Sequence, residues 1–293
     1  MARPRPQQIR RAFSRAGRDF AARDFLHGEI RRRMLEPLGW VRLQPGLIID
    51  AGCGPGEARA GLKRCFPDAR VLALDSAAGM LRLAGGRRVC GDLQQMPLAD
   101  GCAQLLFSNL ALHWCPAMGA ALAEFRRVLD APGLLLFSIF GPDTLKELRA
   151  ARRRAGFADQ PETLLDMHHL GDALLRAGFA DPVMSAERFA VRYPDFASLE
   201  EDLRRLGASR AMMPEGAGLA RRDRRRVVAE AFDAGRDADG AIAVSVEVVY
   251  GQAWTAPLRE AAEPAEVPLE RINLRKGNYI QKSQFPFDSL RLS

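Results

Sequence analysis

The sequence predicts an α/β fold: a doubly wound, mostly parallel sheet of seven strands, with helical insertions that form a lid. Three observations lead to this prediction. Strand-like apolar runs alternate with helical segments between residues 47 and 140. The first of these runs breaks into a glycine-rich turn, LIIDAGCGPG at residues 47 to 56, and helices gather beyond residue 140. Strands separated by helices pair in parallel and carry helices on both faces of the sheet.

The first half of the chain repeats one strand and one helix at a time. EARAGLKRCFP, after the glycine turn, predicts a helix that Pro67 closes, and ARVLALD at 69 to 75 predicts a buried strand that ends on an acid. Further along, we expect a helix at 77 to 84, strands at 87 to 90 and 103 to 108, a helix at 116 to 129 and a strand at 134 to 140. Repeated βαβ units of this kind build a parallel sheet.

The second half of the chain has a different spacing. Helices at about 142 to 155 and 168 to 177 lead to a strand at 183 to 191, and helices at 195 to 206 and 219 to 234 precede a long strand at 242 to 254. We expect three parts: an N-terminal helical segment at 1–40 that covers the ligand site, a main domain at 41–255 with helical insertions at about 142–180 and 195–235, and a polar tail at 256–293.

Composition excludes several classes of protein. With 293 residues, 47% hydrophobic and 27% charged, the chain can bury a full core and is neither disordered nor of low complexity. The formal charge of +7 favours an acidic partner, although 36 acids interleave with 43 bases. No apolar stretch is long enough to span a membrane and no secretion signal is visible, so we expect a soluble, cytoplasmic protein without a membrane partner.

The Arg-rich N-terminus, MARPRPQQIRRAFSRAGRDF, has two interpretations. We favour an amphipathic helix lying on the domain over a mitochondrial presequence, which would also lack acids before Asp19. The five cysteines are odd in number and lack C-x-x-C spacing, which predicts reduced core thiols, no disulfide framework and no zinc site. His168 and His169 are adjacent and point about 100° apart on a helix, so we expect no metal there either.

The glycine-rich turn is shaped for a ligand other than a dinucleotide. Gly52, Gly54 and Gly56 have G-x-G-x-G spacing, whereas a pyrophosphate loop has G-x-G-x-x-G spacing. Asp50, just before the glycines, is a poor neighbour for a pyrophosphate and a good neighbour for a cation. An amino acid that carries an ammonium and a sulfonium group would suit this turn.

Acids at two further strand ends complete the predicted site. In doubly wound sheets, ligands bind beyond the carboxyl ends of the strands. Asp75, at the end of the second strand, is placed to accept both hydroxyls of a ribose, and Asp92, after the third strand, could accept an adenine amino group. Met80 would give the adenine ring an apolar face. The other residues predicted to border this ligand are Ser76, Leu93, Asn109 and Leu110.

At these residues the sequence resembles the class I S-adenosylmethionine-dependent methyltransferases, over residues of about 40 to 140. The resemblance implies a Rossmann-like fold and S-adenosylmethionine as the cofactor, with its methionine moiety in the glycine turn. An unrelated doubly wound protein is the alternative.

The fourth strand leads into FSNLALHW at residues 107 to 114. Methyltransferases that act on amino groups often have an Asn-Pro-Pro-Tyr type motif at this position, and it is absent here. His113 and Trp114 could border the methyl acceptor; alternatively, they begin a helix that packs on the sheet.

Stretches outside the cofactor half resemble one family, the malonyl-acyl-carrier-protein O-methyltransferases of biotin synthesis (BioC). They are IRRAFSRAGRDFAARDFLHGEI near the N-terminus, FGPDTLKELR at 140 to 149, DMHHLGDALLRAGFADPVM at 166 to 184, YPDFASLEEDLRRLGA at 193 to 208 and VEVVYGQAW at 246 to 254. The resemblance implies methylation of the free carboxylate of a malonyl thioester on acyl carrier protein, an early step of biotin synthesis.

This reaction has modest chemical requirements. A malonyl carboxylate is ionised at neutral pH, so it needs no general base; it needs alignment with the sulfonium methyl and exclusion of water. On the family resemblance, Arg149 would grip the carboxylate as a bidentate fork. The alternative for Arg149 is a solvated arginine on a basic helix.

The chain departs from the family pattern on the acceptor side. Phe20 stands in RDFAARDF where a Tyr is usual, and Gln252 stands in YGQAW where a His is usual. SRAMM follows LGA where an Asn is common. The residues predicted to hold the cofactor follow the pattern.

An acidic carrier protein predicts a basic face beside the pocket. The candidates are Arg31 to Arg33, Arg152 to Arg154 and RRDRRR at 221 to 226, with solvated helix faces as the alternative. We expect a monomer that binds no nucleic acid.

Two other functions remain as alternatives. A respiratory complex I assembly factor that hydroxylates an arginine shares FGxDTLxELR-like and LGxxLxRAGF-like stretches with this chain. A methyltransferase with another acceptor, RNA or a small molecule, is the second alternative. RNA is favoured only by the basic charge, because the basic runs lack interleaved aromatic residues for base stacking.

Overall fold

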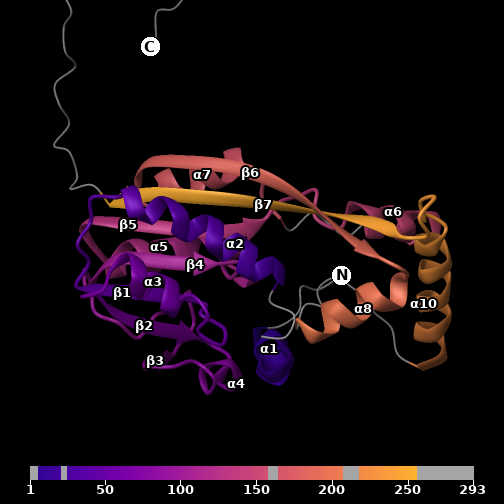
Figure 1. Cartoon of the computed structure of the whole chain (residues 1–293), viewed down its shortest axis with the longest axis horizontal. Helices are drawn as coiled ribbons and strands as arrows, with labels where there is room; N and C mark the ends of the chain where they lie inside the picture. Colours follow the sequence, from indigo (N-terminus) through magenta and orange to yellow (C-terminus); the bar gives the residue numbers. More distant parts are fainter. Residues whose placement is uncertain (1–5, 21–24, 158–163, 207–217, 256–293) are drawn as a thin grey trace, which may run out of the picture. The chain divides into compact units, whose positions relative to one another are not determined.

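Seven strands form one sheet in the computed structural model, which describes residues 6–20, 25–157, 164–206 and 218–255. The strands are β1 (Leu47–Ala51), β2 (Arg70–Asp75), β3 (Arg87–Cys90), β4 (Ala103–Asn109), β5 (Leu129–Phe140), β6 (Ala180–Tyr193) and β7 (Ile242–Thr255). Their order across the sheet is β3-β2-β1-β4-β5-β7-β6 (Figure 1).

The pairing of the strands confirms the predicted doubly wound, mostly parallel sheet. Strands β3, β2, β1, β4 and β5 pair in parallel, and β7 pairs antiparallel with both β5 and β6. The chain runs from β1 outward to β3 and then returns to β4 on the other side of β1. This reversal beside β1 is where sheets of this kind bind ligands.

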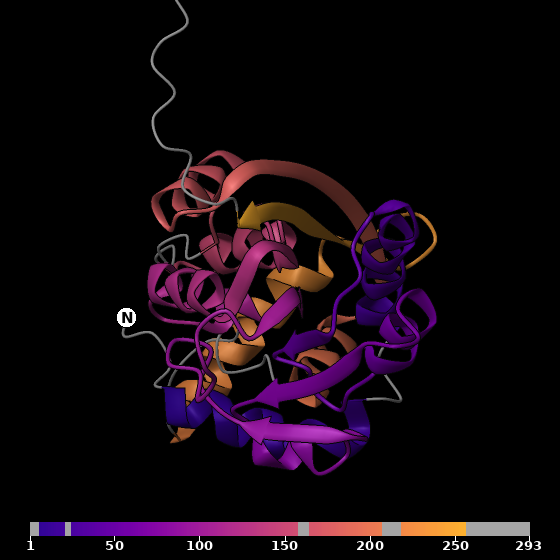
Figure 2. The ribbon, with the colours of Figure 1, turned by 90° about the vertical axis from the view of Figure 1, so that its left-hand side faces the viewer.

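Helices cover both faces of the sheet (Figure 2). They are α1 (Pro6–Phe20), α2 (Phe25–Leu35), the 3-10 helix η2 (Glu36–Trp40), α3 (Arg59–Cys65), α4 (Ala78–Leu81), the 3-10 helix η3 (Leu112–Trp114), α5 (Met118–Val128), α6 (Lys146–Arg154), α7 (Met167–Arg176), α8 (Phe196–Arg205) and α10 (Gly218–Asp233). Ile30 of α2 and Leu62 of α3 are buried on one face, and Phe125 of α5 and Leu170 of α7 on the other.

The second half of β6 and the first half of β7 extend beyond the rest of the sheet. Strand β5 ends at Phe140, opposite Val248 of β7, whereas β6 continues to pair with β7 as far as Tyr193 and Ile242. This two-stranded extension leads to α6, α8 and α10, as Figure 1 shows. A separate core forms there from Leu148 of α6, Phe196 of α8, Val228 of α10 and Val244 of β7. The helices α6, α8 and α10 therefore form a second layer beside the carboxyl edge of the sheet.

Predicted and observed elements agree within a few residues except at two strands. Strand β5 begins at Leu129 and not at 134, and β6 spans Ala180–Tyr193 and not 183 to 191. Partner strands account for both extensions. Ala103 of β4 pairs with Leu129, and β7 pairs with Ala180 and, after an irregularity in the register, with Val183 to Tyr193 of β6. Asp166 and Asp195 cap α7 and α8, accepting hydrogen bonds from the amides of His169 and Ser198.

Within the described ranges, no helix combines the length and the apolar character needed to cross a membrane. The predicted polar tail at 256–293 and the SRAMM segment lie outside the described residues.

Candidate active site

The glycine turn after β1 has a backbone that only glycine adopts easily. Gly52, Gly54 and Gly56 have φ angles of +72°, +55° and +86°, all in the left-handed region. A Cβ on Gly52 would lie 2.2 Å from the Cβ of Ala111, and one on Gly56 would lie 2.9 Å from the Cβ of Ala84. A Cβ on Gly54 would have no neighbour within 4 Å. Gly54 therefore faces open space, whereas Gly52 and Gly56 pack against the protein.

The Asp75 carboxylate, at the end of β2, holds this turn in place. Its Oδ2 accepts a hydrogen bond from the Gly54 amide at 2.9 Å, and its Oδ1 accepts one from the Ala77 amide at 2.7 Å. Burial raises the pKa of Asp75, and the backbone N–H groups that bond to it oppose the rise. The carboxylate is therefore fixed at the carboxyl edge of the sheet.

Asp50 lies beneath the turn, within β1, and is 2% exposed. Its Oδ2 has no hydrogen-bond partner among the described residues. Burial, and then the charge of Asp75, raises the pKa of Asp50 to about 7. A buried carboxylate oxygen without a donor is costly, so this position suits a cationic group supplied by a ligand.

Asp92, which follows β3, is held by helix α1. The Arg10 Nη2 lies 2.6 Å from Asp92 Oδ2, and the Gln94 amide donates to Asp92 Oδ1 at 3.0 Å. Burial opposes the ionisation of Asp92, but the hydrogen bonds from Gln94 and the charge of Arg10 outweigh burial and lower its pKa. The third acid of the predicted site is thus ionised and already paired.

Helix α1 packs directly on α4. A Cβ on Gly79 would lie 2.3 Å from the backbone oxygen of Ser14 and 2.6 Å from its Cα, so only glycine permits this approach. The Gly79 amide donates to Ser14 Oγ at 3.3 Å. Ile9 and Phe13 of α1 line the cavity described below, and Met80 of α4 is 1% exposed beside them.

The chain after β4 makes a strained turn. Leu110 has a φ of +52°, and its amide donates to the backbone oxygen and to Oγ of Ser138, each at 3.0 Å. Ser138 Oγ donates to Asn109 Oδ1 at 2.9 Å, and Asn109 Nδ2 donates to the His27 carbonyl at 3.1 Å. Strained residues held by such networks are concentrated at functional sites.

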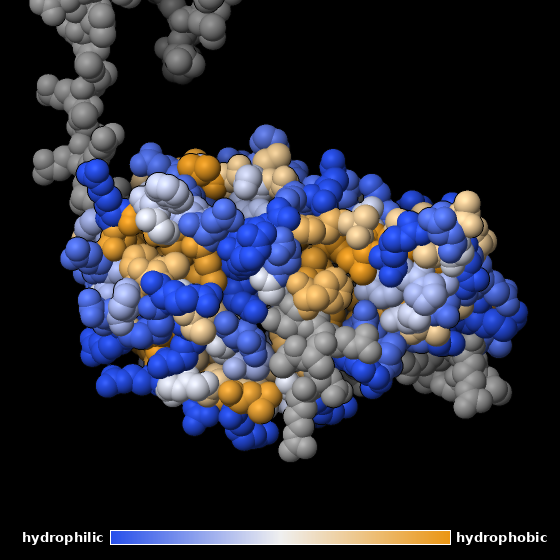
Figure 3. Space-filling view, in the orientation of Figure 1, coloured by the Kyte–Doolittle hydropathy of each residue, from blue (hydrophilic) through white to orange (hydrophobic). Residues whose placement is uncertain are grey.

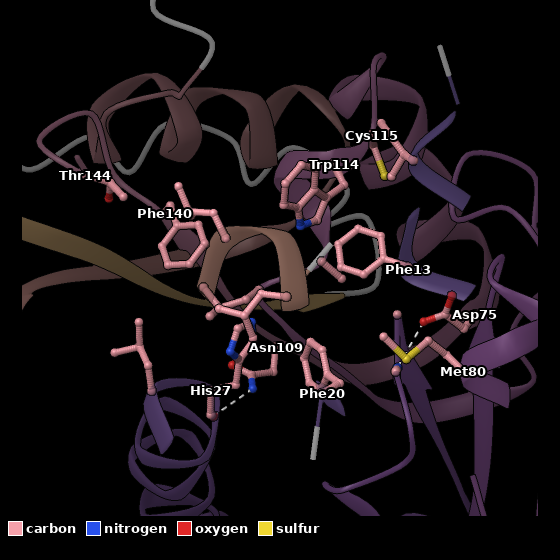
Figure 4. A pocket seen from close by; sticks show the side chains of 18 of the residues that line it. Phe13, Phe20, His27, Asp75, Met80, Asn109, Trp114, Cys115, Phe140 and Thr144 are labelled. Carbon is pink, nitrogen blue, oxygen red and sulfur yellow. Dashed lines mark hydrogen bonds between the residues drawn. The ribbon is translucent and has the colours of Figure 1, made fainter. Parts of the chain in front are cut away.

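Aromatic rings occupy the middle of the site (Figure 4). The Trp114 ring meets Phe13 edge to face, with centroids 5.2 Å apart. The His113 ring centroid lies 5.0 Å from that of Trp114 and 4.9 Å from that of Phe140. Both ring nitrogens of His113 are shielded from solvent and have no hydrogen-bond partner in the described part of the chain. Burial, and then the charge of His27, lowers the pKa of His113 to about 3, so the ring is neutral near pH 7.

These elements enclose one continuous cavity at the carboxyl edge of the sheet. Asp75 and Met80 lie at one end of it and Phe140 and Thr144 at the other, with Trp114 and the Phe rings between them (Figure 4). Hydrophobic atoms also gather at the surface between β7 and α8 (Figure 3). The empty volume, part of it open to solvent, is about 1430 Å³.

Most residues predicted to bind the cofactor line this cavity. They are Gly52, Gly54, Asp75, Ser76, Met80, Asp92, Leu93, Asn109 and Leu110, together with Trp114 from the acceptor set. Asp50, Gly56 and His113 are not part of the lining. The sequence-based prediction missed the inward-facing residues of α1 and α2, such as Phe13 and His27. The amphipathic pattern of the N-terminal segment could have identified the residues of α1 that face the cavity.

Arg149 lies outside the cavity lining. Its guanidinium donates to the backbone carbonyls of Pro142 and Thr144, because the loop before α6 presents these carbonyls within its reach. Thr144 and Leu145 of the same loop do line the cavity, and Leu145 has a φ of +57°. The Arg149 guanidinium, which was predicted to bind the acceptor carboxylate, therefore binds the loop that precedes α6.

The two departures from the family pattern that lie within the described residues have different surroundings. Phe20 lines the cavity, and its ring meets that of His27 with centroids 4.9 Å apart. Gln252 lies within the sheet, opposite Leu136 and Val183, and is not part of the lining.

The cysteines are all free thiols. Cys53 in the glycine turn is buried, as expected, but Cys90 at the end of β3 is exposed, so the prediction of core thiols is wrong for Cys90. Strand β3 forms an edge of the sheet, which explains the exposure.

Four of the arginines proposed as a basic face are engaged with acids. Arg32 and Arg33 both bind Glu29, and Arg33 also binds Glu187 of β6. On α10, Arg225 and Arg226 bind Glu200 and Glu230. Arg152 is buried, at 7% exposure, so it belongs to no solvated basic surface. The positive charge of these four arginines is therefore compensated by neighbouring acids.

Residues 49–137 match a family model described as a methyltransferase domain. A malonyl-[acyl-carrier protein] O-methyltransferase from Methylovorus sp. is 39% identical over 277 residues, which cover 90% of this chain and 93% of that protein. One of the same name from Laribacter hongkongensis is 39% identical over 273 residues, covering 88% and 90%.

A solved structure assigned as a methyltransferase from Bacillus halodurans has the same fold, with a TM-score of 0.51 and 17% identity, covering 76% of this chain and 99% of that one. The fold and the site together define a Rossmann-like methyltransferase that uses S-adenosylmethionine. Within that class, the chain belongs to the malonyl-[acyl-carrier protein] O-methyltransferase family.

Proposed function

We propose that this chain transfers the methyl group of S-adenosylmethionine to the free carboxylate of a malonyl thioester carried by acyl carrier protein, in biotin synthesis. Near full-length identity of 39% to proteins named for this reaction supports the proposal. The alternatives of an assembly factor and an RNA methyltransferase are not favoured, because the similarity covers the acceptor half as well as the cofactor half. We further propose that the enzyme is a cytoplasmic monomer.

The residues at the cofactor end fit S-adenosylmethionine. Asp50 offers a buried oxygen without a donor to the ammonium group of the methionine moiety, directly or through water. Gly54 leaves room for that moiety beside the turn. Asp75 would accept the ribose hydroxyls, and Asp92 the adenine amino group, with Met80 against the ring. We propose that Gly52, Gly56, Ser76, Leu93, Asn109 and Leu110 complete the cofactor site.

The acceptor end of the cavity is suited to a carboxylate that needs no base. S-adenosylmethionine supplies a methyl group bound to a positively charged sulfur. Arg10 is the only arginine or lysine among the described lining residues, and it is paired with Asp92. Trp114, Phe140 and Leu145 exclude water from the opposite end. A carboxylate held there would face the positively charged sulfur of the cofactor as its counter-charge, and no cationic side chain of the described lining would compete for it.

Arg149 has a positioning role in this proposal. Its two hydrogen bonds fix the carbonyls of Pro142 and Thr144, and this loop carries Thr144 and Leu145 into the cavity. Direct binding of the acceptor carboxylate would require the guanidinium to leave both carbonyls. Arg149→Lys should therefore lower kcat and the unfolding free energy together, since a lysine cannot bond both carbonyls as a fork. A variant with a raised KM alone would support direct binding.

His113 borders the acceptor end through Trp114 and Phe140. We propose that its neutral ring orients Trp114, and that one shielded nitrogen donates to the acceptor when the rings shift. His113→Phe should raise the KM for the acceptor and leave the affinity for S-adenosylhomocysteine unchanged. Equal losses in both would show that His113 is only part of the core.

The observation that carries the proposed function is the arrangement of three acids around a glycine turn at one end of a cavity whose other end is apolar. It is tested with S-adenosylmethionine labelled in the methyl group. The label should enter malonyl carrier protein as a base-labile ester, and should not enter the unmalonylated carrier or RNA. The proposal would be contradicted if the labelled methyl group entered RNA, or if it did not enter malonyl carrier protein.

A further inference from the structure

A second cavity, here called the outer cavity, opens beside the first and shares four lining residues with it: Phe25, Val191, Tyr193 and Asp202. Its remaining lining comes from the end of β6, the turn after it and the first two turns of α8: Arg192, Pro194, Asp195, Ala197, Ser198 and Glu201. In Figure 1, α8 lies below the far ends of β6 and β7. The shared residues make the outer cavity a continuation of the active-site cavity toward solvent.

The position of the outer cavity follows from the register of β6. Side chains alternate along a strand, so Val191 and Tyr193 share one face. That face meets the active-site cavity, which both residues line. The route between the cavities therefore runs along the inner face of the two-stranded extension, on the acceptor side and away from Asp75.

The charged side chains of Arg192, Asp195 and Glu201 around the outer cavity are compensated within the protein. Arg192 binds Asp237 at 2.7 Å and Asp239 at 3.3 Å. Glu201 binds Arg204 and Arg205, and Asp195 accepts the Ser198 amide at 2.8 Å as the cap of α8. The walls also carry the apolar side chains of Phe25 and Val191 and the Tyr193 ring. Such a lining suits an uncharged chain with amide groups better than a phosphate or a carboxylate.

We propose that the outer cavity holds the uncharged, amide-containing part of the pantetheine arm that carries the malonyl group. The arm enters between Phe25 and α8, and the thioester end reaches the acceptor end of the active-site cavity. This inference rests on the proposed function. The same arm occurs in malonyl carrier protein and in malonyl-coenzyme A, so both should use the outer cavity.

Larger side chains at Ala197 would narrow the outer cavity. Ala197 is exposed and, of the two cavities, lines only this one. Ala197→Leu and Ala197→Trp should raise the KM for malonyl carrier protein and for malonyl-coenzyme A in order of size. The Trp variant should raise it at least about tenfold, because losing the burial of two methylene groups already has that effect. The affinity for S-adenosylhomocysteine should not change. Ala120→Trp, on an exposed position of α5, is the matched control.

The outcomes separate this inference from the proposed function. If the unaltered protein methylates neither acceptor, the function itself is refuted. If the protein is active and both Ala197 variants equal the control, the arm does not use the outer cavity. A rise in KM for the carrier protein alone would also overturn the inference, because the surface of the carrier would then be the contact.

Discussion

The Asp75 carboxylate accepts a hydrogen bond from the Gly54 amide at 2.9 Å and so joins the end of β2 to the turn after β1. Asp75→Ala removes both this bond and the proposed ribose contact. Hydrogen bonds to charged groups contribute about 1.5–3 kcal/mol, so the affinity for S-adenosylhomocysteine should fall roughly 10- to 100-fold in calorimetry. Asp68→Ala, at an exposed acid before β2, is the control. An unchanged affinity in Asp75→Ala would mean that the ribose lies elsewhere.

The glycines of the turn should separate stability from binding. In Gly54→Ala, the alanine must adopt a left-handed backbone conformation, but its Cβ meets no neighbouring atom. The substitution should therefore lower the unfolding free energy by about 1–2 kcal/mol, and it should weaken cofactor binding more than tenfold because the Cβ occupies the open space. Gly52→Ala adds a Cβ at 2.2 Å from the Ala111 Cβ and should be much less stable. Ala111→Gly in the same chain should restore part of that loss. Urea unfolding and calorimetry measure the two effects, and equal losses of stability would contradict this assignment.

Cofactor binding should depend on pH through Asp50. Its pKa of about 7 lies above the ordinary value of 3.8, so between these values the folded protein binds more protons than the unfolded chain. The unfolding free energy should therefore fall as pH rises across that window. An ammonium group favours the ionised carboxylate, so binding at pH 6 should release a proton, and affinity should rise from pH 6 to 8.

Calorimetry of S-adenosylhomocysteine in buffers of different ionisation enthalpy measures that proton. Asp50→Asn should abolish the proton release and weaken binding at pH 8. Proton release that persists in this variant would assign the titration to another group.

The approach of α1 to α4 should control access to the cofactor. Gly79→Ala places a Cβ 2.3 Å from the Ser14 carbonyl oxygen, so α1 must shift. Cofactor affinity should fall about tenfold, because Ile9 and Phe13 of α1 line the cavity beside Met80 and would lose apolar contact with the ligand, at about 0.8 kcal/mol per methylene group. Trypsin should also cut at Arg10 and Arg15 faster.

Gly171→Ala is the matched control for this substitution. Gly171 lies in α7, and a Cβ at this position would have no neighbour within 4 Å, so alanine there should be neutral or stabilising by about 0.5–1 kcal/mol. If Gly79→Ala behaves like the control in both measurements, α1 does not cover the cofactor.

The sheet and the residues that line the cavity at the ends of β1 and β2 could be predicted because their signals are local. Asp75 ends an apolar run and the glycine turn follows another, and parallel strands bring such ends to one edge. Contacts between distant segments could not be predicted. Arg10 meets Asp92 across 82 positions and Gly79 meets Ser14 across 65, and no periodicity encodes either contact.

Arg149 shows the same limit on the acceptor side. Its position on a basic helix near the site was correct, but the direction of its side chain depends on the carbonyls of the preceding loop. That loop is held by β7, with the Leu145 amide donating to the Ser245 carbonyl at 2.8 Å. Such partners are set by tertiary packing, which residue type and spacing do not specify.

The most direct test of the central claim is the intact mass of malonyl carrier protein after incubation with this protein and S-adenosylmethionine. The account predicts a gain of one methyl group, lost on mild alkaline treatment, and no gain with Asp75→Ala under the same conditions. A carrier of unchanged mass, in the presence of protein that binds S-adenosylhomocysteine, would contradict it.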